Sequence, residues 1–228
     1  FDLADTYRNP VLVMTDGEVG HMRERIVLPE GGALAIRPRR RPTGDRRGYV
    51  PFRARDDGIP AMADFGTGFH TYVTGLTHDE RGLPATDDAA AHTRLVERLC
   101  RKISDDVDRL TRVDEDLEDG ARVGIVSYGI SSRAAAGAVR RLRAAGNAVS
   151  HLRLVTVFPF PERLVRELAS RVDRLIVPEM NLGQICHVVR EAADGAARVE
   201  RVSKIGGEII EPAEIVRAVL EGGEPVEA

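Results

Sequence analysis

Cysteine, tryptophan and lysine are scarce in this sequence, and the scarcity excludes several kinds of site. The 228 residues include two cysteines, no tryptophan, four tyrosines and six phenylalanines. Cys100 and Cys186 lie far apart and have no CxxC spacing, which excludes a disulfide framework, a zinc knuckle and an iron–sulfur ligand set. A chain with two such cysteines is expected in the cytoplasm.

A long apolar run and a strong net charge are also missing. The basic residues, of which only Lys102 and Lys204 are lysines, number 33 against 36 acidic residues, and the formal net charge is -3. No stretch approaches the ~20 apolar residues of a membrane-spanning helix. We therefore expect a soluble globular protein with a sizeable core, no membrane partner and no nucleic-acid partner.

The common nucleotide-binding and nucleophile motifs are absent. Gly66-Thr67-Gly68 is followed by Phe69, so the third glycine of the dinucleotide-binding GxGxxG motif is missing. The sequence has no Walker phosphate loop and no G-x-S-x-G turn around a serine nucleophile. No ATP or NAD site is predicted.

The beginning of the chain predicts short elements separated by breaks. Residues 1–7 resemble the end of a helix, which Pro10 terminates, and the sequence is expected to be a fragment of a longer chain. Residues 11–15 form a short apolar run that predicts a buried strand. Residues 16–21 are polar and predict a loop.

Two contrasting segments follow. Residues 29–60 are rich in proline, glycine and arginine without helical or strand periodicity, and predict a linker. Its arginines either grip phosphates or dock on an acidic surface, and we favour the second because the chain as a whole is acidic. Apolar residues at steps of three and four predict one helix over 88–118, ended by Gly120.

From residue 121 onward, short apolar runs alternate with helical patterns. Strands are predicted over 122–128, 149–158, 175–177 and 198–202, the last as an edge strand. Helices are predicted to begin at Ser131 or Ser132, at Pro161, at Asn181 or Gly183, and at Pro212. Four strand–helix repeats predict an α/β fold: a parallel sheet with helices on both faces and right-handed crossovers.

Two turns and one acidic cluster are candidate binding sites. Residues 128–133 and 179–184 each join a strand to a helix, so they either bind an anion at the helix N-terminus or simply cap it; capping is favoured. Residues 77–80, Thr-His-Asp-Glu, together with His70, offer metal-ligand types. We favour structural roles for these histidines, and no metal site is predicted.

Six stretches carry a further signal: residues 15–24 (TDGEVGHMRE), 73–82 (VTGLTHDERG), 127–129 with 133–134 (SYG and RA), 158–161 (FPFP), 179–184 (EMNLGQ) and 204–207 (KIGG). In this order they resemble the alpha subunit of the 2-oxoacid:ferredoxin oxidoreductases, and within that family the 2-oxoglutarate type. The resemblance covers nearly the whole chain.

The resemblance implies a thiamine-diphosphate enzyme that decarboxylates 2-oxoglutarate, forms succinyl-CoA from coenzyme A and passes electrons to ferredoxin. The family's upstream motifs, Tyr-Pro-x-Thr-Pro and Arg-x-Gly-Pro-Ser-Thr-Gly, are absent here. A Gly-Asp-Gly…Asn pattern for diphosphate and Mg²⁺ and a cysteine cluster for iron–sulfur are absent too. The resemblance therefore places the cofactors mainly on upstream residues and on a beta subunit, and we expect this segment alone to bind none and to be inactive.

The resemblance also implies domain boundaries and site residues. Residues 1–28 resemble the end of a pyrimidine-binding domain, 29–60 the linker, and 61–228 a second domain similar to the C-terminal domain of transketolase. His21 is the candidate catalytic residue, because related thiamine enzymes carry a histidine at this point; the alternative is a structural histidine. Asp16, Gly17 and Gly20 are the candidate cofactor-binding residues.

Two other functions remain open. The same kind of enzyme acting on pyruvate or a branched-chain 2-oxoacid is one, because the resemblance alone favours 2-oxoglutarate. A non-catalytic interaction or scaffold module is the other.

Overall fold

The chain forms two compact units in a computed structural model, which describes residues 1–32 and 35–225. The sheet unit consists of Thr15–Arg23 and Thr111–Ala228, and the loop unit of Phe1–Met14 and Glu24–Leu110. Within the described residues, no helix has the length and apolar character needed to cross a bilayer.

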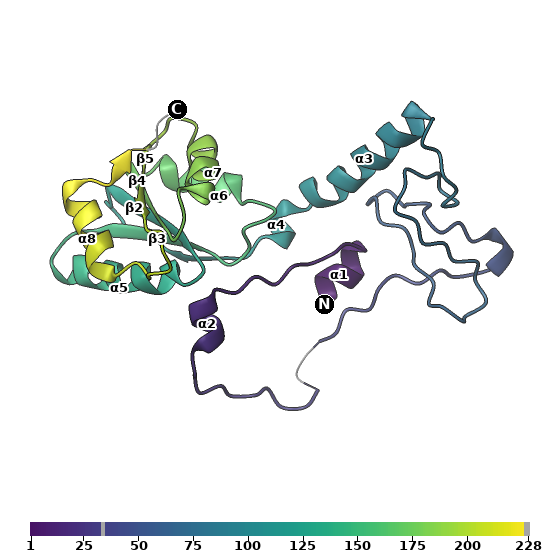
Figure 1. Ribbon diagram of the computed structural model, residues 1–228, viewed down its shortest axis with the longest axis horizontal. Helices are drawn as coiled ribbons and strands as arrows, with labels where there is room; N and C mark the ends of the chain where they lie inside the picture. Colours follow the sequence, from purple (N-terminus) through teal and green to yellow (C-terminus); the bar gives the residue numbers. More distant parts are fainter. Residues whose placement is uncertain (33–34, 226–228) are drawn as a thin grey trace. The chain divides into compact units, whose positions relative to one another are not determined.

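A six-stranded sheet lies at the centre of the sheet unit (Figure 1). Its strands are β1 Val113–Asp116, β2 Val123–Tyr128, β3 Val149–Leu154, β4 Arg174–Glu179, β5 Arg198–Ser203 and β6 Glu224–Pro225. The spatial order is β1-β3-β2-β4-β5-β6. The four middle strands are parallel, and the two outer strands pair antiparallel with their neighbours. The predicted parallel α/β sheet is confirmed.

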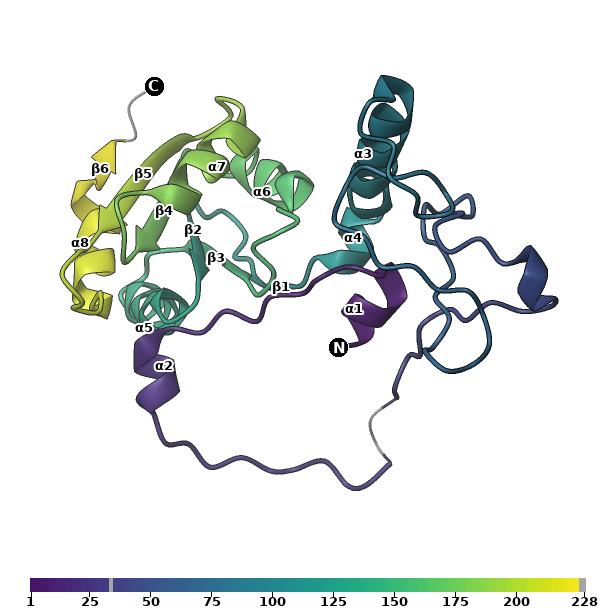
Figure 2. The same cartoon turned by 45° about the vertical axis from the view of Figure 1, so that its right-hand side comes forward.

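Two pairs of helices cover the two faces of this sheet (Figure 2). They are α5 Ser131–Ala144 and α8 Pro212–Glu221 on one face, and α6 Glu162–Ala169 and α7 Gln184–Ala193 on the other. Apolar side chains of β2, β3 and β4 alternate between the two faces, so Ile125 faces α5 and α8 while Val126 faces α6 and α7. Burial on both faces explains why β2 and β4 are largely apolar.

Several predicted boundaries in the sheet unit are wrong. The strand predicted over 149–158 ends at Leu154, and the strand predicted at the sheet edge, 198–202, lies between β4 and β6. Ser131 and Ser132 do not cap α5 but form its first turn. The edge prediction failed because β6 is only two residues long and is held by pairing with β5 rather than by an apolar pattern of its own.

The helix predicted over 88–118 is also wrong. The structure has α3 Ala89–Ser104, the short α4 Val107–Leu110, and then β1. Strand β1 pairs antiparallel with β3, and two ion pairs accompany it, Arg153 of β3 with Asp114 at 3.0 Å and Arg143 of α5 with Asp116 at 2.8 Å. These contacts join residues far apart in sequence, which helical periodicity cannot detect.

The loop unit has little regular structure apart from α3 and α4. It also contains α1 Asp2–Tyr7 and the 3₁₀ turn Arg46–Gly48. The buried Lys102 of α3 joins α1 to α3, because its Nζ donates to the carbonyl oxygens of Tyr7 and Arg8, both at 3.1 Å. Lys102 thus supplies donors to carbonyls at the end of α1, which have no partner within that helix.

Two predictions near the beginning of the chain need correction. Residues 11–15 are not a strand: their backbone pairs with no neighbouring strand among the described residues. An isolated strand cannot satisfy its own N–H and C=O groups, so the apolar pattern alone is insufficient. The predicted loop at 16–21 contains a short helix, α2 Gly17–His21.

Candidate functional site

The candidate site lies at the carboxyl ends of β2 and β4. These neighbouring strands lead to helices on opposite faces of the sheet, α5 after β2 and α7 after β4. In open parallel sheets, ligands bind outside the strand ends at such a switch point, next to the free N–H groups of the helices. What occupies those N–H groups decides what this edge can bind.

The N-terminus of α5 is occupied by the carboxylate of Asp16. The backbone N–H of Ile130 donates to Asp16 Oδ2 at 2.8 Å, across 114 positions of sequence. Gly129 makes this approach possible, because a Cβ at that position would lie 2.7 Å from the same oxygen. Its φ of 54° also suits glycine better than other residues. Asp16, a predicted cofactor-binding residue, is thus brought to one of the two predicted turns.

The N-terminus of α7 is occupied by the buried carboxylate of Glu179, the last residue of β4. The backbone N–H groups of Ile185 and Cys186 donate to its two oxygens, at 2.9 Å and 2.8 Å. The hydroxyl of Tyr128 donates to Glu179 Oε2 at 2.9 Å. Burial and the adjacent Glu179 carboxylate raise the pKa of Tyr128, so its hydroxyl stays protonated as a donor.

Asn181 completes the connection between the two strand ends. Its side-chain oxygen accepts from the backbone N–H groups of Gly183 and Gln184, at 2.8 Å and 2.9 Å, and its Nδ2 donates to the Tyr128 hydroxyl at 2.8 Å. Both helix N-termini therefore already hold side-chain acceptors of this chain. The geometry supports the capping interpretation of the two turns over an open anion site.

A buried serine–histidine pair lies beneath the same edge and was not predicted. Ser127 Oγ lies 2.7 Å from His151 Nε2 and donates to Ser132 Oγ at 3.1 Å. All three residues are buried, and burial lowers the pKa of His151. No cavity described in the chain reaches them, so the pair fixes the turn between β2 and α5 rather than acting as a nucleophile. Its members are 24 residues apart, too far for a local motif to reveal.

The other predicted site residues lie on the exposed helix α2. His21 is its last residue and makes no hydrogen bond within the described parts of the chain, so the alternative of a structural histidine finds no contact to support it. Gly17 and Gly20 have open space around their Cα atoms, with nothing within 4 Å of a built Cβ. The structure brings Asp16 to the sheet edge and leaves His21, Gly17 and Gly20 facing solvent.

The metal and arginine hypotheses can also be compared with the structure. In residues 1–32 and 35–225, no group of three metal-ligating side chains is arranged to hold an ion, which includes His70 and residues 78–80. Three arginines of the predicted linker pair with aspartates of the loop unit: Arg39 with Asp5, Arg40 with Asp57 and Arg41 with Asp64. Docking on acidic residues is what these arginines do in the structure.

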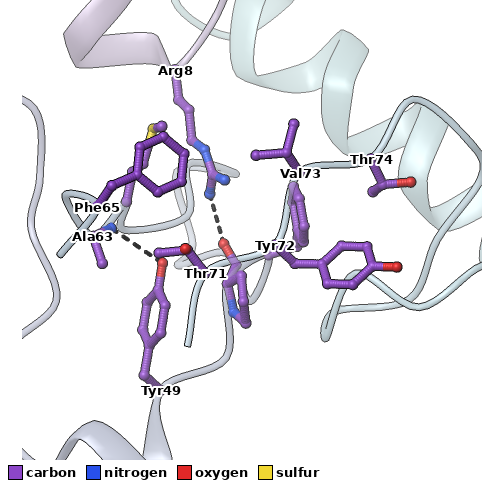
Figure 3. Close-up of a pocket in the computed structure, with 11 residues that line it drawn as sticks. Arg8, Tyr49, Ala63, Phe65, Thr71, Tyr72, Val73 and Thr74 are labelled. Atoms are coloured by element: carbon purple, nitrogen blue, oxygen red, sulfur yellow. Dashed lines mark hydrogen bonds between the residues drawn. The ribbon is translucent and has the colours of Figure 1, made fainter. Parts of the chain in front are cut away.

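The loop unit contains a small aromatic cavity of about 160 Å³ (Figure 3). Tyr49, Phe65 and Tyr72 contribute to its walls. Arg8 Nη1 donates to the carbonyl of Pro51 at 2.6 Å, and the Tyr49 hydroxyl accepts from the N–H of Ala63, at 3.2 Å. The Arg8 guanidinium and the Tyr49 hydroxyl thus hold loops together at this cavity.

Comparison with known proteins shows which family this chain resembles. Residues 121–215 match the family described as pyruvate:ferredoxin oxidoreductase core domain II. The chain is 46% identical, over 97% of its length, to the 2-oxoglutarate synthase subunit KorA of Methanothermobacter thermautotrophicus. The chain is similar in sequence to the 2-oxoacid:ferredoxin oxidoreductases. The predicted resemblance to the alpha subunit of the 2-oxoglutarate type is confirmed.

Two further relatives set the limits of the comparison. The ketoisovalerate oxidoreductase subunit VorB of M. thermautotrophicus is 35% identical over 97% of this chain. A 2-oxoglutarate:ferredoxin oxidoreductase from Magnetococcus marinus, solved with 2-oxoglutarate, coenzyme A and succinyl-CoA bound, superposes with a TM-score of 0.87 at 27% identity. That match covers 97% of this chain and 38% of the solved chain. The chain spans 58% of the KorA relative and 54% of VorB.

The stretches that resemble this oxidoreductase family gather at one edge of the sheet. Residues 127–129 end β2, 179–184 follow β4 and 204–207 follow β5, while 158–161 lie in the connection after β3. Residues 15–24 reach the same edge through Asp16. Five of the six stretches thus meet where strands of a parallel sheet end, although the first and last are almost 200 positions apart.

Proposed function

We propose that this chain forms part of the alpha subunit of a 2-oxoglutarate:ferredoxin oxidoreductase. The complete enzyme would decarboxylate 2-oxoglutarate on thiamine diphosphate, form succinyl-CoA and pass electrons to ferredoxin. One observation carries the choice of substrate: the three relatives of highest identity among those compared, at 41–46%, are 2-oxoglutarate synthase subunits, whereas two ketoisovalerate subunits are at 33–35%, alongside one further 2-oxoglutarate synthase subunit at 34%. Pyruvate or a branched-chain 2-oxoacid is the alternative within the same enzyme class.

The residues described here do not fit thiamine diphosphate and Mg²⁺ by themselves. A diphosphate needs free N–H donors or cations, but Asp16 and Glu179 already occupy the N-termini of α5 and α7. None of the cavities described in the chain is lined by residues 16–21. The cofactor, its Mg²⁺ and the iron–sulfur cluster would therefore be held mainly by other parts of the enzyme.

The contribution of this chain is to hold a short segment in place. Asp16 fixes the start of α2 to the sheet edge, and His21 projects from the end of the same helix without a partner in the described chain. In the complete enzyme, His21 hydrogen-bonds the substrate or an intermediate. Gly17 and Gly20 leave the backbone of α2 open to close approach, which suits the cofactor-binding role predicted for them.

The exposed apolar residues near the start of the loop unit support an assembled enzyme. Leu12 and Val13 are 77% and 90% exposed, and Val27 is 85% exposed. Such side chains are usually buried, and in a cluster they indicate an interaction surface. Residues 1–28 would pack against the remainder of a pyrimidine-binding domain and a beta subunit, with 29–60 as linker and 61–228 as the transketolase-like domain.

The proposed enzyme is a cytoplasmic complex, an expectation that rests on the two unpaired cysteines. Ferredoxin and coenzyme A are partners of the whole complex. The segment of residues 1–228 alone is expected to be inactive, since most of the cofactor-binding residues would lie elsewhere.

A substrate panel on the native complex tests the proposal. The protein is purified with its partners, and viologen reduction is followed with 2-oxoglutarate, pyruvate and 3-methyl-2-oxobutanoate, each with and without coenzyme A. We expect kcat/KM to be highest for 2-oxoglutarate and turnover to require coenzyme A. Preference for another 2-oxoacid would establish the alternative substrate, and no turnover with any 2-oxoacid would favour a non-catalytic scaffold.

The role of His21 has its own test in the complete enzyme. We expect His21→Ala to lower kcat by about 10²-fold, the lower end of what a positioned proton donor or acceptor supplies. His187→Ala is the matched control, because His187 is an exposed histidine on α7. Unchanged kcat and KM in His21→Ala would remove His21 from the mechanism without affecting the substrate assignment.

A further inference from the structure

A row of cations on α3 stands apart from the site described above. Arg94, Arg98 and Lys102 follow one another at steps of four residues, so they share one face of the helix. Arg8 lies close to this row, and its positive charge helps to lower the pKa of both Arg98 and Lys102. None of these four side chains forms an ion pair with a carboxylate in residues 1–32 and 35–225.

This arrangement is electrostatically unfavourable as it stands. Like charges four residues apart on a helix repel one another. The pKa of Lys102 is lowered to about 8, mainly by burial and further by the positive charges of Arg98 and Arg8. Burial, followed by the charge of Arg8, also lowers the pKa of Arg98, and the Glu80 carboxylate opposes this only weakly. A bound anion would relieve the repulsion.

His78 adds an unsatisfied polar atom beside this row. Its Nδ1 lies 2.8 Å from the carbonyl oxygen of Leu76, and a carbonyl can only accept, so Nδ1 carries a hydrogen. The ring lies against Phe52, with 4.2 Å between the ring centres. Its Nε2 is buried and has no hydrogen-bond partner. Buried polar atoms are nearly always paired, so this one indicates a missing group.

His78, Arg94 and Arg98 line one cavity of about 280 Å³. Two carboxylates also line it, Asp79 and Glu80, and both have partners. Asp79 Oδ1 accepts from the backbone N–H groups of its own turn, at 2.9 Å, and Glu80 pairs with Arg53 at 3.2 Å. Arg94 and Arg98 therefore line the cavity without a carboxylate partner among the described residues, although the Asp79 carboxylate lines it too.

We propose that this cavity binds a phosphate group of a small molecule. The guanidinium groups of Arg94 and Arg98 suit bidentate contacts to phosphate oxygens, and Arg98 uses only one Nη1–H, toward the carbonyl of Gly58 at 3.2 Å. His78 Nε2, which has a lone pair and no donor, accepts from a P–OH group of the phosphate. The volume admits a phosphate or diphosphate rather than a large ligand. Lys102 contributes charge, since its Nζ is engaged with the carbonyls of Tyr7 and Arg8.

Hydrogen exchange on the complete native protein tests this site without requiring turnover, so its outcome is independent of the proposed function. Amide exchange in residues 76–98 is measured against increasing inorganic phosphate, with chloride at equal ionic strength as the reference. We expect phosphate to slow exchange there in a saturable manner. A parallel titration with ADP shows whether the phosphate is better recognised on a nucleotide or as the free ion.

Two variants and a control locate the binding. Arg94→Gln, at an exposed position, is expected to raise the half-saturating phosphate concentration about tenfold, the loss of one charge-assisted contact. His78→Asn keeps a donor for the Leu76 carbonyl and removes Nε2, and should weaken binding about threefold or more. Arg141→Gln removes an exposed guanidinium from α5 and should change nothing. No saturable effect in the native protein, or equal effects in all variants, would overturn the proposal.

Discussion

The two units of this chain are stabilised in different ways. Among the described residues, the sheet unit buries apolar clusters of 15 and 12 residues on the two faces of its sheet. The cluster of the loop unit has three buried members, Tyr7, Ile59 and Leu110. Since apolar burial is the main favourable term in folding, the sheet unit has a core of its own and the loop unit has very little.

Polar contacts to the backbone replace much of the missing core in the loop unit. Arg8, Arg40 and Arg98 each donate to a carbonyl oxygen of the segment 51–59, at 2.6 to 3.2 Å. Each such bond adds only about 1 to 3 kcal/mol, and less where water competes. The sheet unit is therefore stabilised by its own apolar core, whereas the loop unit depends on charged contacts and on the surface that covers its exposed apolar residues.

Truncation of the sheet core should have the largest effect. Leu175 is fully buried in β4, and Leu175→Ala is expected to lower the free energy of unfolding of the sheet unit by about 2–5 kcal/mol. Urea denaturation of the purified subunit gives the change. Leu117→Ala, at a residue 39% exposed, is the matched control and should stay within about 0.5 kcal/mol. Equal effects of the two variants would contradict the core assignment.

Lys102 should make the loop unit pH-dependent. Because burial lowers its pKa to about 8 from 10.5, the unfolded chain binds more protons than the folded chain between these values. Stability of the loop unit therefore rises with pH across this window, by at most about 1.4 kcal/mol per pH unit. Below pH 8, where Lys102 is charged in both the folded and the unfolded chain, the full cost of burying its charge lowers the stability of the loop unit.

The variant Lys102→Met isolates this effect. Pulse proteolysis at sites within Glu24–Leu110 is compared for both proteins from pH 7.5 to 10. The stability difference between wild type and Lys102→Met should grow with pH in favour of the wild type. A difference that is constant with pH would show that Lys102 keeps its ordinary pKa.

Asp16 should have a smaller and local effect. Asp16→Ala removes the acceptor for the Ile130 N–H, which is expected to cost about 1 kcal/mol, as loss of a helix cap does. Amide exchange should accelerate at Ile130 and over residues 15–23. Glu18→Ala, an exposed acid on the same helix α2, is the control. Unchanged exchange in Asp16→Ala would mean that the contact does not hold α2 to the sheet.

A surface ion pair of the loop unit should have the smallest effect. Arg41 and Asp64 are 58% and 38% exposed, so Arg41→Ala is expected to change the free energy of unfolding by less than about 1 kcal/mol. Thermal unfolding at low and high salt measures it. A larger effect, or one insensitive to salt, would mean that the arginines hold the loop unit more strongly than exposed pairs do.

The same comparison explains what the sequence could predict. Strands β2 to β5 carry buried apolar residues between turns, so local patterning is sufficient to predict them. Strand β1 falls within the predicted helix because Val113 and Leu117 continue its apolar spacing, whereas the strand that pairs with it, β3, is distant in sequence. Patterning works where local burial decides the structure, and fails where pairing with a distant strand decides it.

The candidate site follows the same rule. The turns after β2 and β4 were predicted, because strand-to-helix connections in a parallel sheet meet at one edge. The contact between Asp16 and the turn after β2 was not predicted, since it spans 114 positions and depends on the absence of a Cβ at Gly129. The cation row of α3 was not predicted either, because only the fold places His78 beside Arg94 and Arg98 in one cavity.

Hydrogen exchange of residues 1–228, alone and within the native complex, tests most directly whether this chain is one part of a larger enzyme. Strands β2 to β5 should be protected in both samples, because their core is complete. Residues 11–14 and 26–28, whose apolar side chains are exposed here, should exchange freely in the isolated segment and slowly in the complex. Free exchange of these residues in the complex as well would contradict the account.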